Sequence, residues 1–237
     1  MTESEQFARK AVKQLRAVTL RNAPPDGYLG TAKYEILGVY TKDVEQIGKS
    51  LLTDLPDDWI AALTELRAQN IFEAKVLATD IAVRKHKLFA KGQWPEFAKW
   101  LNDCEGWALV DNLCCDVLSV FVLRWPELVS KSEPWQRSRS IWKRRASIVT
   151  LVRPARAGHF AAELLDRMAT LAADHDPMIQ KAISWGLRSL ISTHRKEVET
   201  FLHNYSQVVK PAVIREVKTK LDTGRKTNLN RNAKAKT

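Results

Sequence analysis

The sequence predicts an all-α protein, and three observations support this prediction. Only nine Gly and nine Pro occur among 237 residues that are 45% hydrophobic, which disfavours β-rich and low-complexity classes. Apolar residues recur at spacings of three and four over residues 5–18, 71–90 and 159–172. Strand-like alternation is absent over any useful length, so helices are expected throughout.

Polar residues mark where several of these helices begin. Side chains of Asp and Thr accept hydrogen bonds from the first backbone N–H groups of a helix, which have no partner inside it. The predicted starts are Thr41 and Asp43, Asp57 and Asp58, and Asp176 followed by Pro177.

Four prolines stand near helix starts at nearly regular intervals. Pro56, Pro95, Pro134 and Pro177 are 39, 39 and 43 residues apart. Each interval holds two helical patterns, and a helix pair of about 40 residues is the size of a HEAT-like or armadillo-type repeat. Antiparallel pairs of this kind stack into a curved solenoid with a concave groove. We expect one such domain over residues 1–222, although chance placement of the prolines is the alternative.

The last 15 residues, 223–237, contain Leu229 as their one apolar side chain larger than Ala. They cannot bury enough surface to offset the entropy of ordering. A flexible basic tail is therefore expected.

Positive charge is concentrated in two segments. The net charge is +11. Residues 131–157 hold eight Lys and Arg against one acid, and residues 210–237 hold nine against two, so each segment carries +7. The remaining residues carry −3, which favours a basic groove and a polyanionic partner over a generally basic protein.

Several other classes are disfavoured. No apolar run reaches about 18 residues and the N-terminus lacks a signal-peptide core, so a cytoplasmic protein without a membrane partner is expected. Cys104, Cys114 and Cys115 have no His at ligand spacing and are expected to be buried, reduced thiols rather than metal ligands. Phosphate-loop, dinucleotide, HExxH, CxxC and GxSxG motifs are absent.

Asp111, in the stretch GWALVDNLCC, is the candidate for chemistry. On a regular helix, Trp107, Cys114, Cys115 and Leu118 would lie on its side, so its own helix offers it no cation. A carboxylate in such surroundings is costly unless a cation or a ligand meets it. A buried ion pair with an arginine and a functional site both remain open from this pattern.

Two further stretches carry candidate binding residues. SIWKRRASIV places Lys143, Arg144 and Arg145 in succession on a helix, so at least one of them must face a groove or solvent. MIQKAISWGLRSL places Trp185 among apolar residues, where a tryptophan is more often part of a core.

Three motifs together resemble the AlkD-type DNA alkylation repair glycosylases. They are WALVD at 107–111, WKRRA at 142–146 and IQKAISW at 179–185. The resemblance is strongest over residues 106–205, and LGVYTKD at 37–43 is similar to the N-terminal part of the family. The first 30 residues and the tail match little. The resemblance implies a solenoid of HEAT-like repeats.

The resemblance also implies roles for individual residues. It makes Asp111 the catalytic carboxylate, Trp107 and Trp185 the aromatic residues that contact the substrate, and Arg145 the contact to a DNA phosphate. Lys143 and Arg144 would extend that contact. The chain departs from the family at Gly106 and Ala108, where a second Trp and an acid are common, which leaves lesion preference open.

The implied substrate is duplex DNA containing purines alkylated at N3 or N7. Such a base is cationic and leaves as a neutral molecule, so one carboxylate can suffice without a general acid or a cofactor. We expect a monomer in a bacterial cytoplasm or nucleoid. The alternatives are a catalytically inactive HEAT-like protein that binds damaged or branched DNA, and a protein-binding scaffold.

Overall fold

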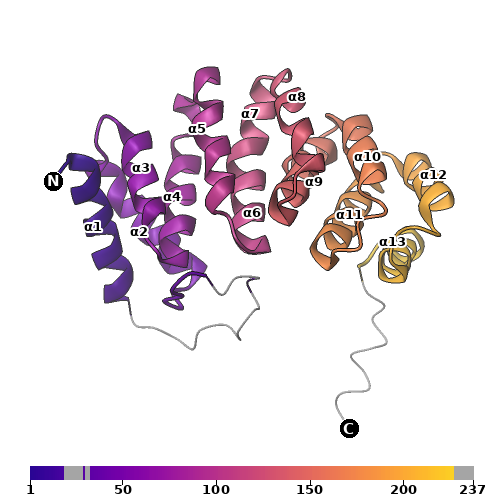
Figure 1. Ribbon diagram of the computed structural model, residues 1–237, viewed down its shortest axis with the longest axis horizontal. Coiled ribbons are helices and arrows are strands. Elements are labelled where there is room, and N and C mark those ends of the chain that lie inside the picture. Colours follow the sequence, from indigo (N-terminus) through magenta and orange to yellow (C-terminus); the bar gives the residue numbers. More distant parts are fainter. Residues whose placement is uncertain (19–28, 30–32, 227–237) are drawn as a thin grey trace, which may run out of the picture. The chain divides into compact units, whose positions relative to one another are not determined.

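The computed structural model describes residues 1–18, 29 and 33–226 (Figure 1). Regular structure in this part of the chain is helical, apart from one isolated parallel bridge between Glu35 and Ile71. The prediction of an all-α protein is thereby confirmed. Of the predicted tail, residues 227–237 lie outside the described residues.

The chain divides into two compact units, Met1–Phe121 and Val122–Thr237, which are described separately as the N-terminal and C-terminal units. None of the described helices is long and apolar enough to cross a membrane.

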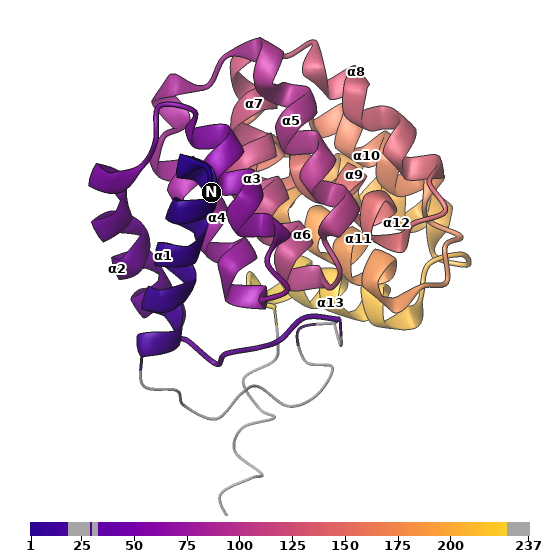
Figure 2. The ribbon, with the colours of Figure 1, turned by 60° about the vertical axis from the view of Figure 1, so that its left-hand side comes forward.

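The N-terminal unit is built of paired helices. Helix α3 packs against α1 and α4, α2 packs against α4, and α4 also contacts α6 (Figure 2). The segments labelled η are 3-10 helices, except η5, which is a π-helix. The elements are α1 (Glu3–Ala17), α2 (Thr41–Leu51), η1 (Leu52–Asp54), α3 (Trp59–Ala68), α4 (Phe72–Arg84), η2 (His86–Leu88), η3 (Lys91–Gln93), α5 (Trp94–Lys99), η4 (Trp100–Asp103), α6 (Trp107–Leu113), η5 (Cys114–Leu118) and α7 (Ser119–Arg124), which runs past the boundary.

The C-terminal unit continues the same pattern. Helix α9 packs against α10 and α11, and α11 packs against α13. The elements are α8 (Leu128–Ser132), η6 (Glu133–Arg137), α9 (Ile141–Arg156), α10 (Ala161–Thr170), α11 (Pro177–Leu190), α12 (Arg195–Tyr205) and α13 (Pro211–Thr223). Paired helices of this kind agree with the predicted helical repeats.

Two of the three predicted helix starts are confirmed by their caps. The Asp58 carboxylate accepts from the backbone N–H of Ala61 at 3.2 Å, and that of Asp176 accepts from Met178 at 2.7 Å. The third start differs by one position, because Thr41 is itself the first helical residue.

Two of the four regularly spaced prolines lie in the first turn of an α-helix. Pro95 and Pro177 lie in the first turns of α5 and α11, as expected for residues that lack an N–H. Pro134 lies in the first turn of the 3-10 helix η6 instead, and Pro56 precedes the N-cap of α3 by two residues.

The three cysteines are buried free thiols, as predicted. Burial raises the pKa of Cys104 to about 11, so this thiol is protonated at neutral pH. A protonated, buried thiol is a poor nucleophile and metal ligand.

A buried group of charges holds the segment that leads into α6. Arg67 of α3 and Lys75 of α4 are 2% and 3% exposed, and both meet the carboxylate of Asp103 at the end of η4. The Arg67 Nη2 to Asp103 Oδ1 distance is 2.5 Å, and the Lys75 Nζ to Asp103 Oδ2 distance is 3.1 Å. The Tyr34 hydroxyl donates to the Asp103 carbonyl at 2.5 Å. We call these four residues the Asp103 cluster.

Further bonds from the Asp103 cluster fix the backbone before α6. Arg67 also donates to the carbonyl of Trp100 at 3.3 Å and to the Sγ of Cys104 at 3.4 Å. Burial lowers the pKa of Lys75 and raises that of Tyr34 to about 12. Buried charges are costly unless each is matched by partners, so the cluster tolerates little change. Its geometry sets where the chain enters α6.

The Asp103 cluster yields a stability prediction. Asp103→Asn leaves two buried cations without their carboxylate, and we expect the free energy of unfolding to fall by about 2–4 kcal/mol, somewhat below the range for a fully buried pair. Guanidinium denaturation followed by circular dichroism measures this change.

The matched control is Asp80→Asn, in the same unit. Asp80 pairs with Arg84 at 2.7 Å, but burial raises the pKa of Asp80, so the neutral amide is better tolerated there. A loss of about 1 kcal/mol or less is expected. Equal losses for the two variants would contradict the role given to the Asp103 cluster.

Candidate functional site

The six predicted site residues fall into two groups, one in each unit, and Lys143, Arg144 and Arg145 all lie on α9. Trp107 and Asp111 lie on α6 of the N-terminal unit, and both are half-buried. Arg145 lies on α9 and Trp185 on α11 of the C-terminal unit. Each group of residues therefore lies within one unit.

Helix α6 begins with a glycine that the backbone requires. Gly106 is the N-cap, and its φ of 99° lies in a region that side chains with a Cβ rarely adopt. Trp107 is the first helical residue, and Asp111 follows one turn later on the same side. The spacing of the WxxxD motif thus places the indole and the carboxylate side by side along one helix.

A π-helix changes the surroundings predicted for Asp111. Regular α-geometry ends at Leu113, and η5 continues to Leu118 with wider turns. The backbone N–H of Ser119 bonds to the carbonyl of Cys114, five residues earlier. Offsets computed at 3.6 residues per turn therefore hold from Trp107 to Cys114, whose N–H still bonds to the carbonyl of Val110 four residues earlier, and they change within η5.

The degree of burial separates Asp111 from the two cysteines that follow it. Cys114 and Cys115 are 0% and 5% exposed, whereas Asp111 is only half-buried. The carboxylate thus lies nearer the surface than the two thiols with which the regular pattern grouped it. A half-buried carboxylate is accessible to a ligand while water is partly excluded from it.

In the C-terminal unit, Arg145 is buried at the contact between α9 and α11. Its side chain is 5% exposed, and Nη1 donates to the carbonyl of Met178 at 2.5 Å. Met178 lies in the first turn of α11, two turns before the half-buried Trp185. Arg145 therefore helps fix the helix that carries Trp185, in addition to any contact with DNA.

Arg144 and Lys143 have different surroundings. The Nε of Arg144 donates to the Asp174 carboxylate at 2.6 Å, and its Nη1 donates to the carbonyls of Ser138 and Arg139 at 2.9 and 3.0 Å. Arg144 thus holds two loops together. Lys143 is half-exposed in the first turn of α9, where the positive end of the helix dipole adds to its charge.

Gln180 of the IQKAISW motif has a structural role that sequence reasoning missed. This residue is 3% exposed, and its Nε2 donates to the carbonyls of Ala172 and Asp174 at 3.0 and 2.8 Å. Its Oε1 accepts from the backbone N–H of Lys210 at 2.9 Å. The amide therefore ties the start of α13 to the loop before α11. A glutamine on an otherwise apolar helix face was the available signal.

Gly186, next to Trp185, permits a close helix contact. A Cβ at this position would lie 2.6 Å from the Sδ of Met168 on α10. The glycine therefore allows α10 and α11 to pack closely beside Trp185.

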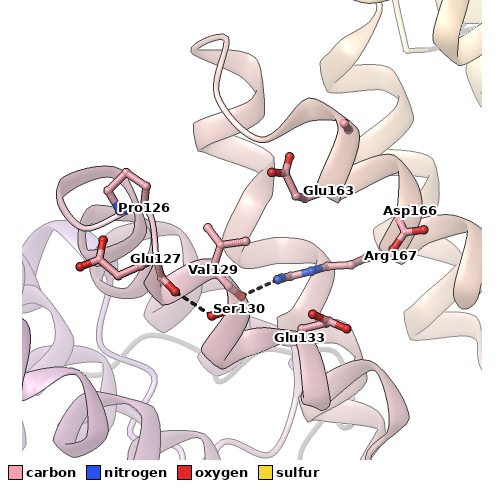
Figure 3. Close-up of a pocket in the computed structure, with 9 residues that line it drawn as sticks. Pro126, Glu127, Val129, Ser130, Glu133, Glu163, Asp166 and Arg167 are labelled. Carbon is pink, nitrogen blue, oxygen red and sulfur yellow. Dashed lines mark hydrogen bonds between the residues drawn. The ribbon is translucent and has the colours of Figure 1, made fainter.

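An acidic hollow in the C-terminal unit is lined by none of the predicted site residues. Its volume is about 570 Å³, and its lining includes Glu127, Glu133, Glu163 and Asp166. Figure 3 shows the Arg167 side chain reaching the carbonyl of Val129, to which it donates at 2.8 Å. Four carboxylates repel a polyanion, so the hollow is unsuited to DNA phosphates.

Comparisons with known proteins agree with the observed fold and identify the family. Among solved structures, the chain is similar to a protein described as "Predicted DNA alkylation repair enzyme from Enterococcus faecalis", with a TM-score of 0.73 and 17% identity. The match covers 86% of this chain and 100% of that one, and at this identity it shows a shared fold. No curated protein matches the sequence.

The family comparison covers almost the whole chain. Residues 3–221 match the family described as "DNA alkylation repair enzyme". The resemblance seen in the three sequence motifs is thereby confirmed, and the chain belongs to the family of DNA alkylation repair enzymes.

Proposed function

We propose that the protein is a monofunctional DNA glycosylase that removes cationic N3- or N7-alkylated purines from duplex DNA. The observation that carries this proposal is the placement of Asp111 on α6, half-buried and one turn after the half-buried Trp107. Membership of a DNA alkylation repair family supports DNA as the substrate.

One carboxylate is enough for this reaction. An alkylated purine carries a positive charge and departs as a neutral base, so its departure needs no general acid. The deoxyribose gains oxocarbenium character as the glycosidic bond breaks. Asp111 would stabilise this charge and orient or deprotonate the attacking water, which adds to the sugar carbon and leaves an abasic site.

By the family resemblance, Trp107 and Trp185 would each contact the reacting sugar. An indole face attracts a nearby cation by about 0.5–2 kcal/mol, so Trp107 and Trp185 would favour the charged sugar. They would also displace water, which strengthens the field of Asp111. Their half-buried state leaves part of each indole accessible for this contact.

Phosphate contacts would come from the first turns of α9. Lys143 is half-exposed there, beside backbone N–H groups that favour an anion. Arg145 would reach a phosphate through its forked donors while fixing α11. Arg144, already paired with Asp174, would contribute chiefly by shaping the loop beside this turn. Such contacts position the duplex without reading its sequence.

The decisive test is release of 7-methylguanine from methylated duplex DNA under single-turnover conditions. Asp111→Asn keeps the shape of the side chain but removes its charge. We expect the excision rate to fall at least about 100-fold, since loss of one electrostatic group costs about that factor. DNA affinity should change far less, because Asp111 acts on the reacting sugar.

Asp116→Asn is the matched control, because Asp116 is a half-buried aspartate on the adjoining η5 that bonds Asn112 at 3.1 Å. It should retain most of the rate. Release that is equally fast in Asp111→Asn would remove Asp111 from the mechanism. Salt-sensitive binding without any release by the wild type would favour the catalytically inactive DNA-binding alternative.

A second prediction concerns Trp185. Trp185→Ala removes the indole from α11, and we expect single-turnover excision to slow by roughly tenfold, which corresponds to the loss of a cation-π contact of about 1–2 kcal/mol. Trp135→Ala, at another half-buried tryptophan of the same unit, is the control and should excise normally after folding is verified. Normal excision by Trp185→Ala would exclude its indole from the site.

A further inference from the structure

Helix α1 presents a basic face that none of the three motifs touches. Arg9, Lys13 and Arg16 recur at spacings of four and three, and all three are exposed. With Val12, Ala17 and Gln69 they line a hollow of about 470 Å³. We call Arg9, Lys13 and Arg16 the α1 basic face.

The charges around α1 are distributed unevenly. The described residues that line the hollow include three cations and no acid. Arg16 is anchored from outside the lining by two bonds to the Glu35 carboxylate, at 2.8 and 2.6 Å. Lys10, on the adjacent face of the same helix, meets Asp54 at 3.0 Å. Lys10 therefore carries the same charge as each residue of the α1 basic face and lies on the same helix, but Asp54 neutralises it.

We propose that the α1 basic face is a second DNA-backbone contact, which grips the duplex away from the lesion. The proposal rests on the proposed function for the identity of the polyanion. From Arg9 to Arg16 the helix rises about 10.5 Å, and successive phosphates of one strand advance about 3.4 Å along a duplex. The cations therefore span the length of about three phosphates. Arg16 is already paired with Glu35, so Arg9 and Lys13 would supply the phosphate contacts, Arg9 through its paired donors.

Packing within the N-terminal unit sets how far this contact lies from Asp111. Helix α1 contacts α4, and α4 contacts α6. Packed helix axes are about 8–10 Å apart, so the two steps place α1 at most about 20 Å from α6. At about 3.4 Å per base pair this is at most about six base pairs. The α1 basic face would hold an arm of the duplex rather than the damaged nucleotide.

The first experiment measures binding to an undamaged 26-base-pair duplex between 50 and 200 mM salt. Arg9→Gln/Lys13→Gln removes two cations and keeps the Arg16 ion pair. Each lost phosphate contact reduces the slope of log affinity against log salt concentration by about 0.9. Between 50 and 200 mM salt, the affinity of the wild type should therefore fall by about tenfold more than that of the variant. Undamaged DNA makes the result independent of base excision.

Lys10→Gln is the control, because it removes the same charge from the same helix at a site already neutralised by Asp54. It should keep the wild-type slope. An unchanged slope in the double variant, or an equal change in Lys10→Gln, would overturn the proposal. So would a loss of binding to vesicles with 25% anionic lipid while DNA binding is unchanged, since the face would then serve a membrane surface.

A second experiment tests the distance. Duplexes carry a tetrahydrofuran abasic analogue with arms of either four or twelve base pairs. The double variant should lose more affinity, relative to the wild type, with long arms than with short arms. Equal weakening with both arm lengths would contradict a contact on the arm of the duplex away from the lesion.

Discussion

In the N-terminal unit, the start of α6 depends on the ion pairs that two buried cations form with one carboxylate. Arg67 and Lys75 come from two packed helices and converge on Asp103. At 2–3% exposure, burial of either cation would be costly without that carboxylate and the backbone carbonyls beside it. Since Asp103 ends η4 and Gly106 begins α6, this ion group defines the entry to the helix that carries Asp111. The placement of Asp111 and the stability of this unit thus depend on the same contacts.

The proposed site in the C-terminal unit follows a similar principle. Arg145 and Arg144 are held by Met178 and Asp174, so these basic residues of the middle motif also act as braces. Gln180 adds a third tie, to the start of α13. Functional side chains placed on braced helices are more precisely positioned than side chains on loops. Some basic residues of this motif therefore hold helices and loops in place, and a charge count alone does not separate them from other cations.

Local patterns predicted the helices well because the interactions that begin a helix are local. Asp58 and Asp176 cap the helices that follow them, and the Trp107 to Asp111 spacing holds because it falls within one regular turn. The family was also evident, since its motifs are short and contiguous. The register beyond Cys114 was not predictable, because a π-helix is set by packing rather than by periodicity.

Contacts between distant residues escaped prediction for a related reason. Arg144 meets Asp174 across 30 residues, and no local pattern links them. The net charge of the N-terminal segment did not reveal the α1 basic face, because Glu3 and Glu5 at the start of α1 offset its cations in the sum. Glu3 and Glu5 lie in the first turn and the three cations follow after it, so the position of side chains along the helix separates the two signs. Charge distribution on faces is therefore more informative than charge totals for this chain.

The central chemical claim is that one carboxylate suffices because the base leaves as a neutral molecule. The most direct measurement compares the excision of 7-methylguanine with that of hypoxanthine and uracil, in otherwise identical duplexes under single-turnover conditions. Single-carboxylate catalysis predicts release of the cationic base and no detectable release of the two neutral ones. Comparable release of neutral bases would require a proton donor, and would contradict the mechanism assigned to Asp111.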